Sequence, residues 1–153
     1  RDCKFIFTHF VPHEDTAHRG LSQLGPASRR ACMGALLTAG TAVLEPTLAI
    51  EVRVPTDLVG NVATILSGKR GKVLDMSQKG ASSIVIGEIP ASETFTLSEA
   101  MRGQTAGRAT WNTSFKAWTE VPKSMLATAV ADIRKRKGLA PDPPGIGEYI
   151  DKE

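Results

Sequence analysis

Two hydrophobic periodicities, one typical of strands and one typical of helices, follow each other along residues 44–117 and restrict the folds open to this chain. Apolar and polar residues alternate over residues 48–54 and again over 109–117, as they do in a strand with one buried face. Between these stretches, residues 58–66 carry apolar side chains at helical spacing. The patterns predict a strand, an amphipathic helix and a later strand.

Two further strands and a short helix complete this part of the chain. Residues 72–78 and 82–89 are strand-like and lie one hairpin connection apart, and residues 93–101 predict a short helix. The order strand, helix, strand, strand, helix, strand is the split βαβ arrangement of ferredoxin-like domains, with both helices on one face of an antiparallel sheet. We therefore predict a ferredoxin-like βαββαβ sandwich over residues 43–122. Trp111 and Phe115 share one strand face and are expected in its core.

The residues on either side predict a smaller α+β part and a terminal helix. Residues 3–11 are rich in β-branched and aromatic side chains, which favours a strand. Gly25 and Pro26 then predict a helix start, and Gly40 predicts its end. Residues 123–137 predict a last helix, followed by an extended Pro-rich tail. The fold class of the whole chain is expected to be α+β.

Charge and the distribution of apolar residues restrict the classes of protein to which this chain can belong. Nineteen Lys and Arg against sixteen Asp and Glu give a formal charge of +3, which by itself does not indicate nucleic-acid binding. No apolar run approaches the roughly 20 residues of a membrane span, and the first residues lack the pattern of a signal peptide. The sequence therefore predicts a cytoplasmic monomer with no membrane partner. Because it opens without Met in a strand-like stretch, we expect it to be a piece of a longer protein.

Catalytic and metal-binding patterns are missing from the sequence. It contains no set of nucleophile, base and orienting group, no paired carboxylates in a cleft-like context and no G-x-x-x-x-G-K-[ST] phosphate loop. His9, His13 and His18 suggest a metal site only weakly, because side chains alternate in direction along a strand and no carboxylate and cysteine set accompanies them. The chain is predicted to be no enzyme and to hold no metal and no cofactor of its own.

The most specific motif spans residues 13–23, His-Glu-Asp-Thr-Ala-His-Arg-Gly-Leu-Ser-Gln. It resembles the Asp-x-x-His-Arg-Gly-x-x-Gln loop of translation elongation factor 2 of the archaeal and eukaryotic type. Further motifs of that family follow in the same order at residues 44–46, 67–73, 102–109 and 133–139, so the resemblance covers nearly the whole chain. Two departures exist. Gly20-Leu21-Ser22 stands where the family usually has Gly-Gly-Gly or Gly-Pro-Ala, and residues 118–122 lack an insertion typical of eukaryotic members, which favours the archaeal branch.

The resemblance implies an organisation and a function. Residues 1–42 would be the C-terminal half of domain IV, a partial βα unit of a ribosomal-protein-S5-like domain. Residues 43–122 would be the ferredoxin-like domain V, and 123–153 a C-terminal helix and tail. The implied function is GTP-dependent translocation of tRNA and mRNA, with GTP and Mg expected in a missing N-terminal domain. The implied partners are ribosomal RNA, stalk-base proteins of the ribosome, the tRNA and mRNA of the decoding region, and the diphthamide-synthesis enzymes.

The same resemblance assigns site residues. In this family the loop histidine becomes diphthamide, which implies that role for His18. Asp15, Arg19, Gly20 and Gln23 are expected to support the loop, Asp15 through an Asx-turn contact with backbone amides. The candidates for RNA contact share a basic side chain: Arg19, Arg29, Arg30, Lys69 and Arg70. The alternative for each is an ordinary surface charge or a cation that complements a helix C-terminus.

Two other functions stay open at this point. One is a free-standing RNA-binding ferredoxin-like module, although the aromatic pattern expected on its central strands is missing. The other is a fragment of a related GTPase that acts in ribosome assembly or splicing. Such a protein is not expected to keep the Asp15-x-x-His18-Arg19-Gly20 loop.

Overall fold

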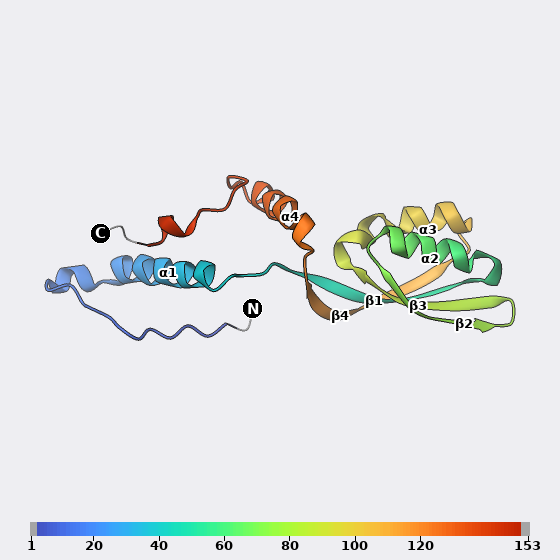
Figure 1. Ribbon diagram of the computed structural model, residues 1–153, viewed down its shortest axis with the longest axis horizontal. Coiled ribbons are helices and arrows are strands. Elements are labelled where there is room, and N and C mark those ends of the chain that lie inside the picture. The colour runs from blue at the N-terminus through green and yellow to red at the C-terminus, as the bar shows by residue number, and fades with distance from the viewer. Residues whose placement is uncertain (1–2, 151–153) are drawn as a thin grey trace. The chain divides into compact units, whose positions relative to one another are not determined.

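The computed structural model describes residues 3–150, and the chain divides into two compact units. Unit 2 is Val43–Pro122, and unit 1 combines the residues up to Ala42 with those from Lys123 onward. Figure 1 labels the helices and strands of both units. We describe each unit by itself. The limits of unit 2 coincide with the predicted ferredoxin-like segment, whereas the assignment of either unit to a numbered domain of the family stays a prediction.

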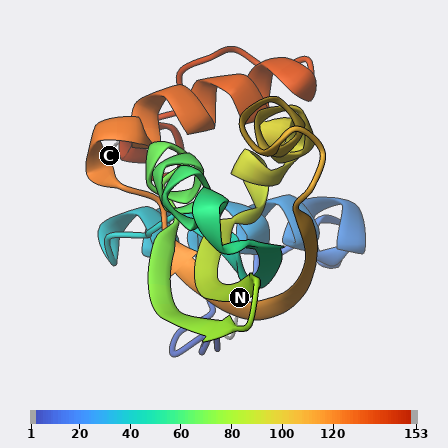
Figure 2. The same cartoon turned by 90° about the vertical axis from the view of Figure 1, so that its right-hand side faces the viewer.

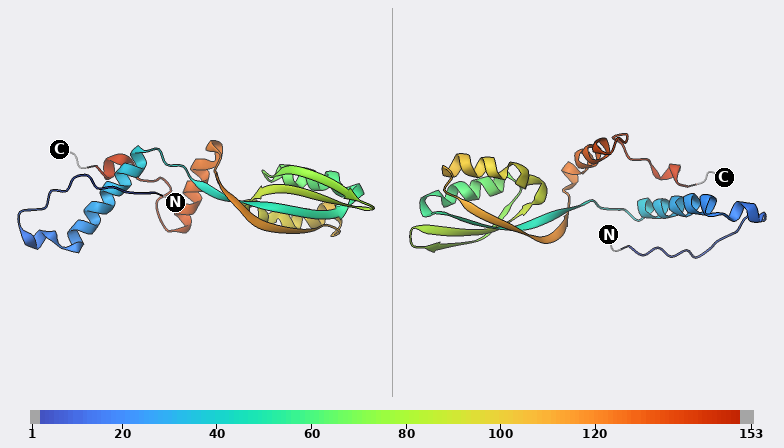
Figure 3. Two further views of the ribbon diagram at one scale, coloured as in Figure 1. Left: turned by 90° about the horizontal axis from the view of Figure 1, so that it is seen from below. Right: turned by 180° about the vertical axis from the view of Figure 1, so that it is seen from behind.

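Unit 2 is a four-stranded antiparallel sheet with two helices on one face. Its elements follow the predicted order: β1 (Leu44–Pro55), α2 (Val59–Gly68), β2 (Lys72–Lys79), β3 (Ser82–Pro90), α3 (Leu97–Thr105) and β4 (Thr110–Glu120). The strands lie in the order β2-β3-β1-β4, and all neighbours are antiparallel. Views along and across the sheet show α2 and α3 on the same side of it (Figures 2 and 3). The ferredoxin-like prediction is confirmed.

The core of unit 2 lies between this face of the sheet and the two helices. The inward residues of β1 and β3 alternate with exposed or half-buried ones, as the period of two requires. Those residues and the inner faces of the helices are no more than 4% exposed: Ile50, Val52, Val54, Val62, Ile65, Leu66, Val85, Ile89, Leu97 and Met101. Each such side chain contributes roughly 1.5–3 kcal/mol by leaving water. Aliphatic packing therefore holds unit 2 together.

Gly87 of β3 lies at a place where the neighbouring strand β2 leaves no room for a side chain. A Cβ added there would lie 2.6 Å from the backbone oxygen of Lys72 and 3.5 Å from Cδ1 of Leu66. Gly87 pairs with Val73 of the edge strand β2 on one side and with Ile50 of the central strand β1 on the other. Only a residue without a side chain fits between β2 and β1 here.

The prediction that Phe115 belongs to the core is wrong. Its side chain is 58% exposed, whereas Trp111 is half-buried and packs against the core. Both lie on edge strand β4, where an irregularity sets Leu48 opposite Phe115 and the preceding Thr47 opposite Ala117. Alternation along a strand predicts which face a residue occupies. It does not predict whether a helix covers that part of the face.

Unit 1 contains two longer helices, α1 (Leu21–Thr38) and α4 (Lys123–Arg136), and two short 3₁₀ turns, η1 (Thr16–Arg19) and η4 (Ile146–Glu148). The tail packs on α1: a Cβ added at buried Gly34 would lie 3.8 Å from Cβ of Tyr149. Arg30 also donates from Nη2 to the backbone oxygen of Glu148, at 3.4 Å. None of the helices in the described part of the chain is long and apolar enough to cross a membrane.

Two predictions for unit 1 are wrong. Residues 3–11 form no strand, because no other strand among the described residues offers them a ladder of hydrogen bonds. Helix α1 begins at Leu21 rather than at Gly25 and Pro26. The amides of Gln23 and Leu24 both donate to the Gly20 oxygen at 3.0 Å and start the helix, so Pro26 lies inside it and removes a single helical hydrogen bond.

Candidate functional site

The loop before α1 is closed by short hydrogen bonds that begin at Asp15. Its Oδ1 accepts from the amide of Ala17 at 2.9 Å, and its backbone oxygen accepts from the amide of His18 at 3.1 Å. The first contact is the Asx-turn expected for Asp15, and it caps η1. His18 is therefore presented from a turn whose backbone is fixed.

Two side chains flank the imidazole of His18. The Nε2 of Gln23, on the first turn of α1, lies 3.1 Å from Nδ1 of His18. The ring centroids of His13 and His18 are 4.8 Å apart, and the rings are tilted by 56°. The side chain of His18 is nevertheless 52% exposed. The ring is thus held by its neighbours and accessible from solvent.

Arg19 ties the two ends of the loop together. Its Nε donates to the backbone oxygen of His13 at 2.7 Å, and its Nη2 donates to that of Glu14 at 3.0 Å. Arg19 thus contacts the backbone of the loop, while its supporting role and its contact with RNA stay predictions. Gly20 caps α1 with an ordinary extended backbone, φ −72° and ψ 159°, so no left-handed conformation requires glycine there.

The other basic candidates lie elsewhere. Arg29 and Arg30 are exposed on α1 in the same unit as the loop. Lys69 and Arg70 follow α2 in unit 2, where Nζ of Lys69 donates to Oγ1 of Thr96. RNA contacts for all four stay predictions. Within the described residues, no group of three His, Cys, Asp or Glu side chains could hold a metal ion.

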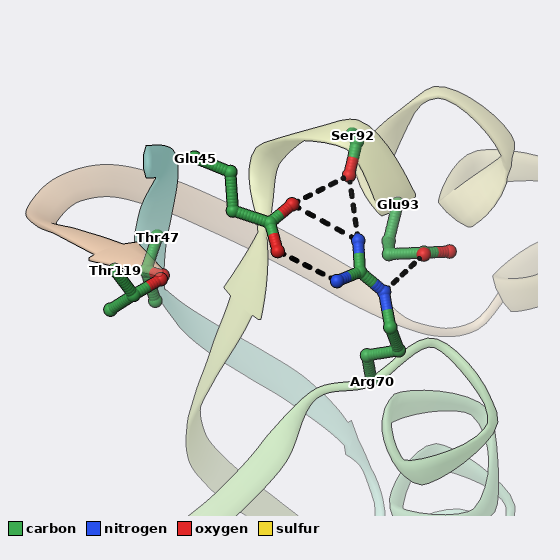
Figure 4. A network of polar contacts seen from close by, with 6 residues as sticks. All are labelled: Glu45, Thr47, Arg70, Ser92, Glu93 and Thr119. Carbon is green, nitrogen blue, oxygen red and sulfur yellow. Dashed lines mark hydrogen bonds and ion pairs between the residues drawn. The ribbon is translucent and has the colours of Figure 1, made fainter. Parts of the chain in front are cut away.

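Arg70 is the centre of an ion-pair network in unit 2 (Figure 4). Its Nη1 and Nη2 donate to the two carboxylate oxygens of Glu45 at 2.7 and 3.0 Å, and its Nε donates to Glu93 at 2.8 Å. Ser92 accepts a further hydrogen bond from Nη2 at 2.9 Å. We call these four residues the Arg70 clamp. It joins the end of α2 to β1 and to the 3₁₀ segment η3 (Ala91–Thr96).

The clamp changes the acid strength of its members. Hydrogen bonds from Arg70 are the main reason why the pKa of Glu45 is lowered from 4.5, and hydrogen bonds to Glu45 are the main reason why the pKa of Arg70 is raised. Sequence reasoning missed Glu45, Ser92 and Glu93, because they are more than twenty positions from Arg70. Only the fold brings them together.

The comparisons with known proteins now bear on both units. The family model described as "Elongation factor G C-terminus" matches residues 42–138, which include all of unit 2 and the helix α4. The chain belongs to the elongation factor G C-terminus family. This membership agrees with the resemblance seen in the sequence motifs.

Two relatives named elongation factor 2 are similar to this chain over nearly its whole length, including the residues before unit 2. The chain is 80% identical over its whole length to elongation factor 2 of Cenarchaeum symbiosum (strain A), and 45% identical over 98% of its length to that of Staphylothermus marinus. It covers 21% and 20% of these two proteins, so it spans about a fifth of their length. The chain is thus similar to the C-terminal segment of a translation elongation factor.

A solved structure supports the fold of the elongation factor G C-terminus family. The crystal structure of a protein from Thermus thermophilus matches with a TM-score of 0.54 and 30% sequence identity. The match covers 63% of this chain and 14% of that one. It agrees with a ferredoxin-like unit inside a larger protein.

Proposed function

We propose that this chain is the ribosome-binding C-terminal segment of an elongation factor 2 that promotes GTP-dependent translocation of tRNA and mRNA. The observation that carries the proposal is the 80% identity to an elongation factor 2 over all 153 residues, which includes the loop of His18. GTP and Mg²⁺ would be bound by a nucleotide-binding domain outside this chain. Its partners would be ribosomal RNA, stalk-base proteins, and the tRNA and mRNA in the decoding region.

His18 would be the residue modified to diphthamide by the enzymes that synthesise this group. The half-exposed imidazole on a hydrogen-bonded turn supports this assignment, because an enzyme can reach the ring while the backbone stays fixed. A long cationic group at this place could contact phosphates without rearrangement of the loop. Its mass would be seen on the tryptic peptide of residues 5–19 from the native protein.

The test is a translocation assay with the full-length factor and ribosomes from the same organism. The change His18→Ala is expected to slow translocation several-fold while GTP hydrolysis continues, because the nucleotide site lies outside this chain. His9→Ala is the matched control, since His9 is an exposed histidine of the same unit outside the loop. A full-length protein that neither co-sediments with ribosomes nor supports translocation would refute the proposal.

A further inference from the structure

The surroundings of His18 go beyond what a merely exposed residue needs, and they lead to an inference that rests on the proposed function. We propose that His13 and Gln23 are positioning residues that hold the imidazole of His18 in one orientation, as the neutral tautomer with its proton on Nε2. This oriented ring is the form that the modifying enzymes meet. The loop of residues 13–23 would then be recognised in its folded form.

Gln23 selects the tautomer of His18. The amide nitrogen Nε2 of Gln23 lies 3.1 Å from Nδ1 of His18 and can only donate, so a hydrogen bond between the two atoms requires the tautomer whose Nδ1 accepts and carries no proton. The proton of the neutral ring then sits on Nε2. This nitrogen faces Oδ2 of Asp15 at 3.8 Å, too far for a hydrogen bond but close enough for the carboxylate to favour an N–H on that side.

His13 is the second side chain that contacts the imidazole of His18. Its ring lies 4.8 Å from that of His18, and its Nδ1 accepts from the amide of Asp15 at 3.0 Å, which fixes the ring of His13 in turn. Its backbone oxygen is held by Arg19. Rotation of the His18 ring about its Cβ–Cγ bond would therefore disturb its contacts with both His13 and Gln23.

Such a site lowers the entropic cost of ordering the His18 ring when a modifying enzyme binds. An unrestrained surface histidine samples several ring orientations, and an enzyme that uses one of them must order the ring on binding. A hydrogen bond worth ~1 kcal/mol corresponds to about a fivefold larger population of the oriented ring. Loss of either neighbour should lower the modified fraction by about that factor when modification is limiting.

The tautomer can be measured directly on this chain. With ¹⁵N-labelled histidine, the 153 residues give signals from only three imidazoles. At about pH 8.5 a free imidazole is neutral, and the ¹⁵N chemical shifts of its two ring nitrogens then show which of them carries the proton. We expect Nε2–H for His18 in the unchanged chain. Gln23→Glu, whose carboxylate only accepts, is expected to move the proton to Nδ1. A wild-type His18 with its proton on Nδ1 would overturn the proposal.

The consequence for modification is measured in the full-length protein made in its native cells. Gln23→Leu and His13→Ala are each expected to reduce the modified fraction of His18 about fivefold, read by mass spectrometry of its tryptic peptide. Glu14→Ala is the matched control, because the loop uses the backbone oxygen of Glu14. Amide spectra of the variants establish that they fold.

The outcomes separate this inference from the proposed function. If wild-type His18 is modified and both variants are modified to the same extent, the positioning role is refuted and the function stands. If wild-type His18 is unmodified in the native cell, the assignment of His18 under the proposed function is refuted. The nitrogen shifts still decide in that case whether Gln23 sets the tautomer.

Discussion

Arg70 shows how a single residue can fix a backbone turn. Its φ of 55° lies in the left-handed region, which costs a non-glycine residue roughly 1 kcal/mol. The side chain leaves this turn and reaches two carboxylates on different elements. Because the side chains of Arg70 and Glu45 are only 25% and 14% exposed, water screens their ion pair less than it screens a surface pair. The clamp therefore offsets the strain of the turn.

Loss of the Glu45 charge should destabilise unit 2. We expect Glu45→Gln to lower the free energy of unfolding by about 1–2 kcal/mol at pH 7, because a bidentate, charge-assisted contact is replaced by a neutral one. Since the native pKa of Glu45 is lowered from 4.5, the stabilisation is fully present above pH 4.5 and is lost as the pH falls through the native pKa. Urea unfolding should therefore show a smaller difference in the free energy of unfolding between the unchanged protein and Glu45→Gln in acid than at pH 7.

Glu51→Gln is the control for this experiment. Its carboxylate pairs with Arg53 at 3.1 Å, but these side chains are 37% and 69% exposed. Such a surface pair contributes at most about 1 kcal/mol. Equal effects of the two substitutions, or a Glu45→Gln effect that does not change with pH, would show that the clamp is not a source of stability.

At the scale of elements, hydrophobic period predicted β1 and α2 of unit 2, whereas the helix predicted over residues 93–101 lies at Leu97–Thr105, after the 3₁₀ segment η3. The alternation around Ile50 and Val52 predicted β1, and helical spacing from Leu58 to Leu66 predicted α2, since both patterns reflect burial against a single core. The prediction of a strand over residues 3–11 was wrong because it did not rest on burial against that core. Its composition suits a sheet, but a strand also needs a partner, and local sequence does not specify one.

Residues of the candidate site could be predicted only where the family motif assigned them a role. The motif around His18 singled out Asp15, Arg19 and Gln23, and the structure shows contacts for each of them within the loop. His13 is the first residue of the quoted motif, but its only role predicted from the sequence was that of a weak metal ligand. Its contact with His18 depends on a turn that reverses the chain between them, and side-chain alternation along a supposed strand could not predict that turn.

Two glycines of unit 2 should respond in opposite directions to alanine. Gly87→Ala is expected to lower the free energy of unfolding by about 1–3 kcal/mol, because its Cβ would collide with the Lys72 carbonyl and force the strands apart. Gly103→Ala, inside α3 with nothing within 4 Å of its Cβ, is expected to raise it by about 0.5–1 kcal/mol. Urea midpoints measure both, and a destabilising Gly103→Ala would contradict the packing described for α3.

At the scale of the whole molecule, unit 2 has a core of its own. The buried residues of that core, and the partly buried ones packed against them, all lie between Leu48 and Trp111. The two ends of unit 2 also meet, since the amide of Val121 donates to the oxygen of Val43 at 2.9 Å. A core and closed ends within one segment are the properties of an independently folding domain.

We therefore expect a polypeptide of residues 43–122 to fold alone. Its amide spectrum should overlay that of the same residues in the 153-residue chain, and its urea unfolding should be a single cooperative transition. The same segment carrying Gly87→Ala provides a destabilised reference. A poorly dispersed spectrum of the unchanged segment would mean that unit 2 depends on contacts with residues outside it.

The discontinuity of unit 1 has a consequence for biosynthesis. Its first segment, with α1, leaves the ribosome before unit 2, and its second segment, with α4 and η4, leaves after it. The contact between Gly34 on α1 and Tyr149 therefore forms only after the tail has been made. Unit 2 can therefore be complete before the contact between α1 and the C-terminal tail has formed.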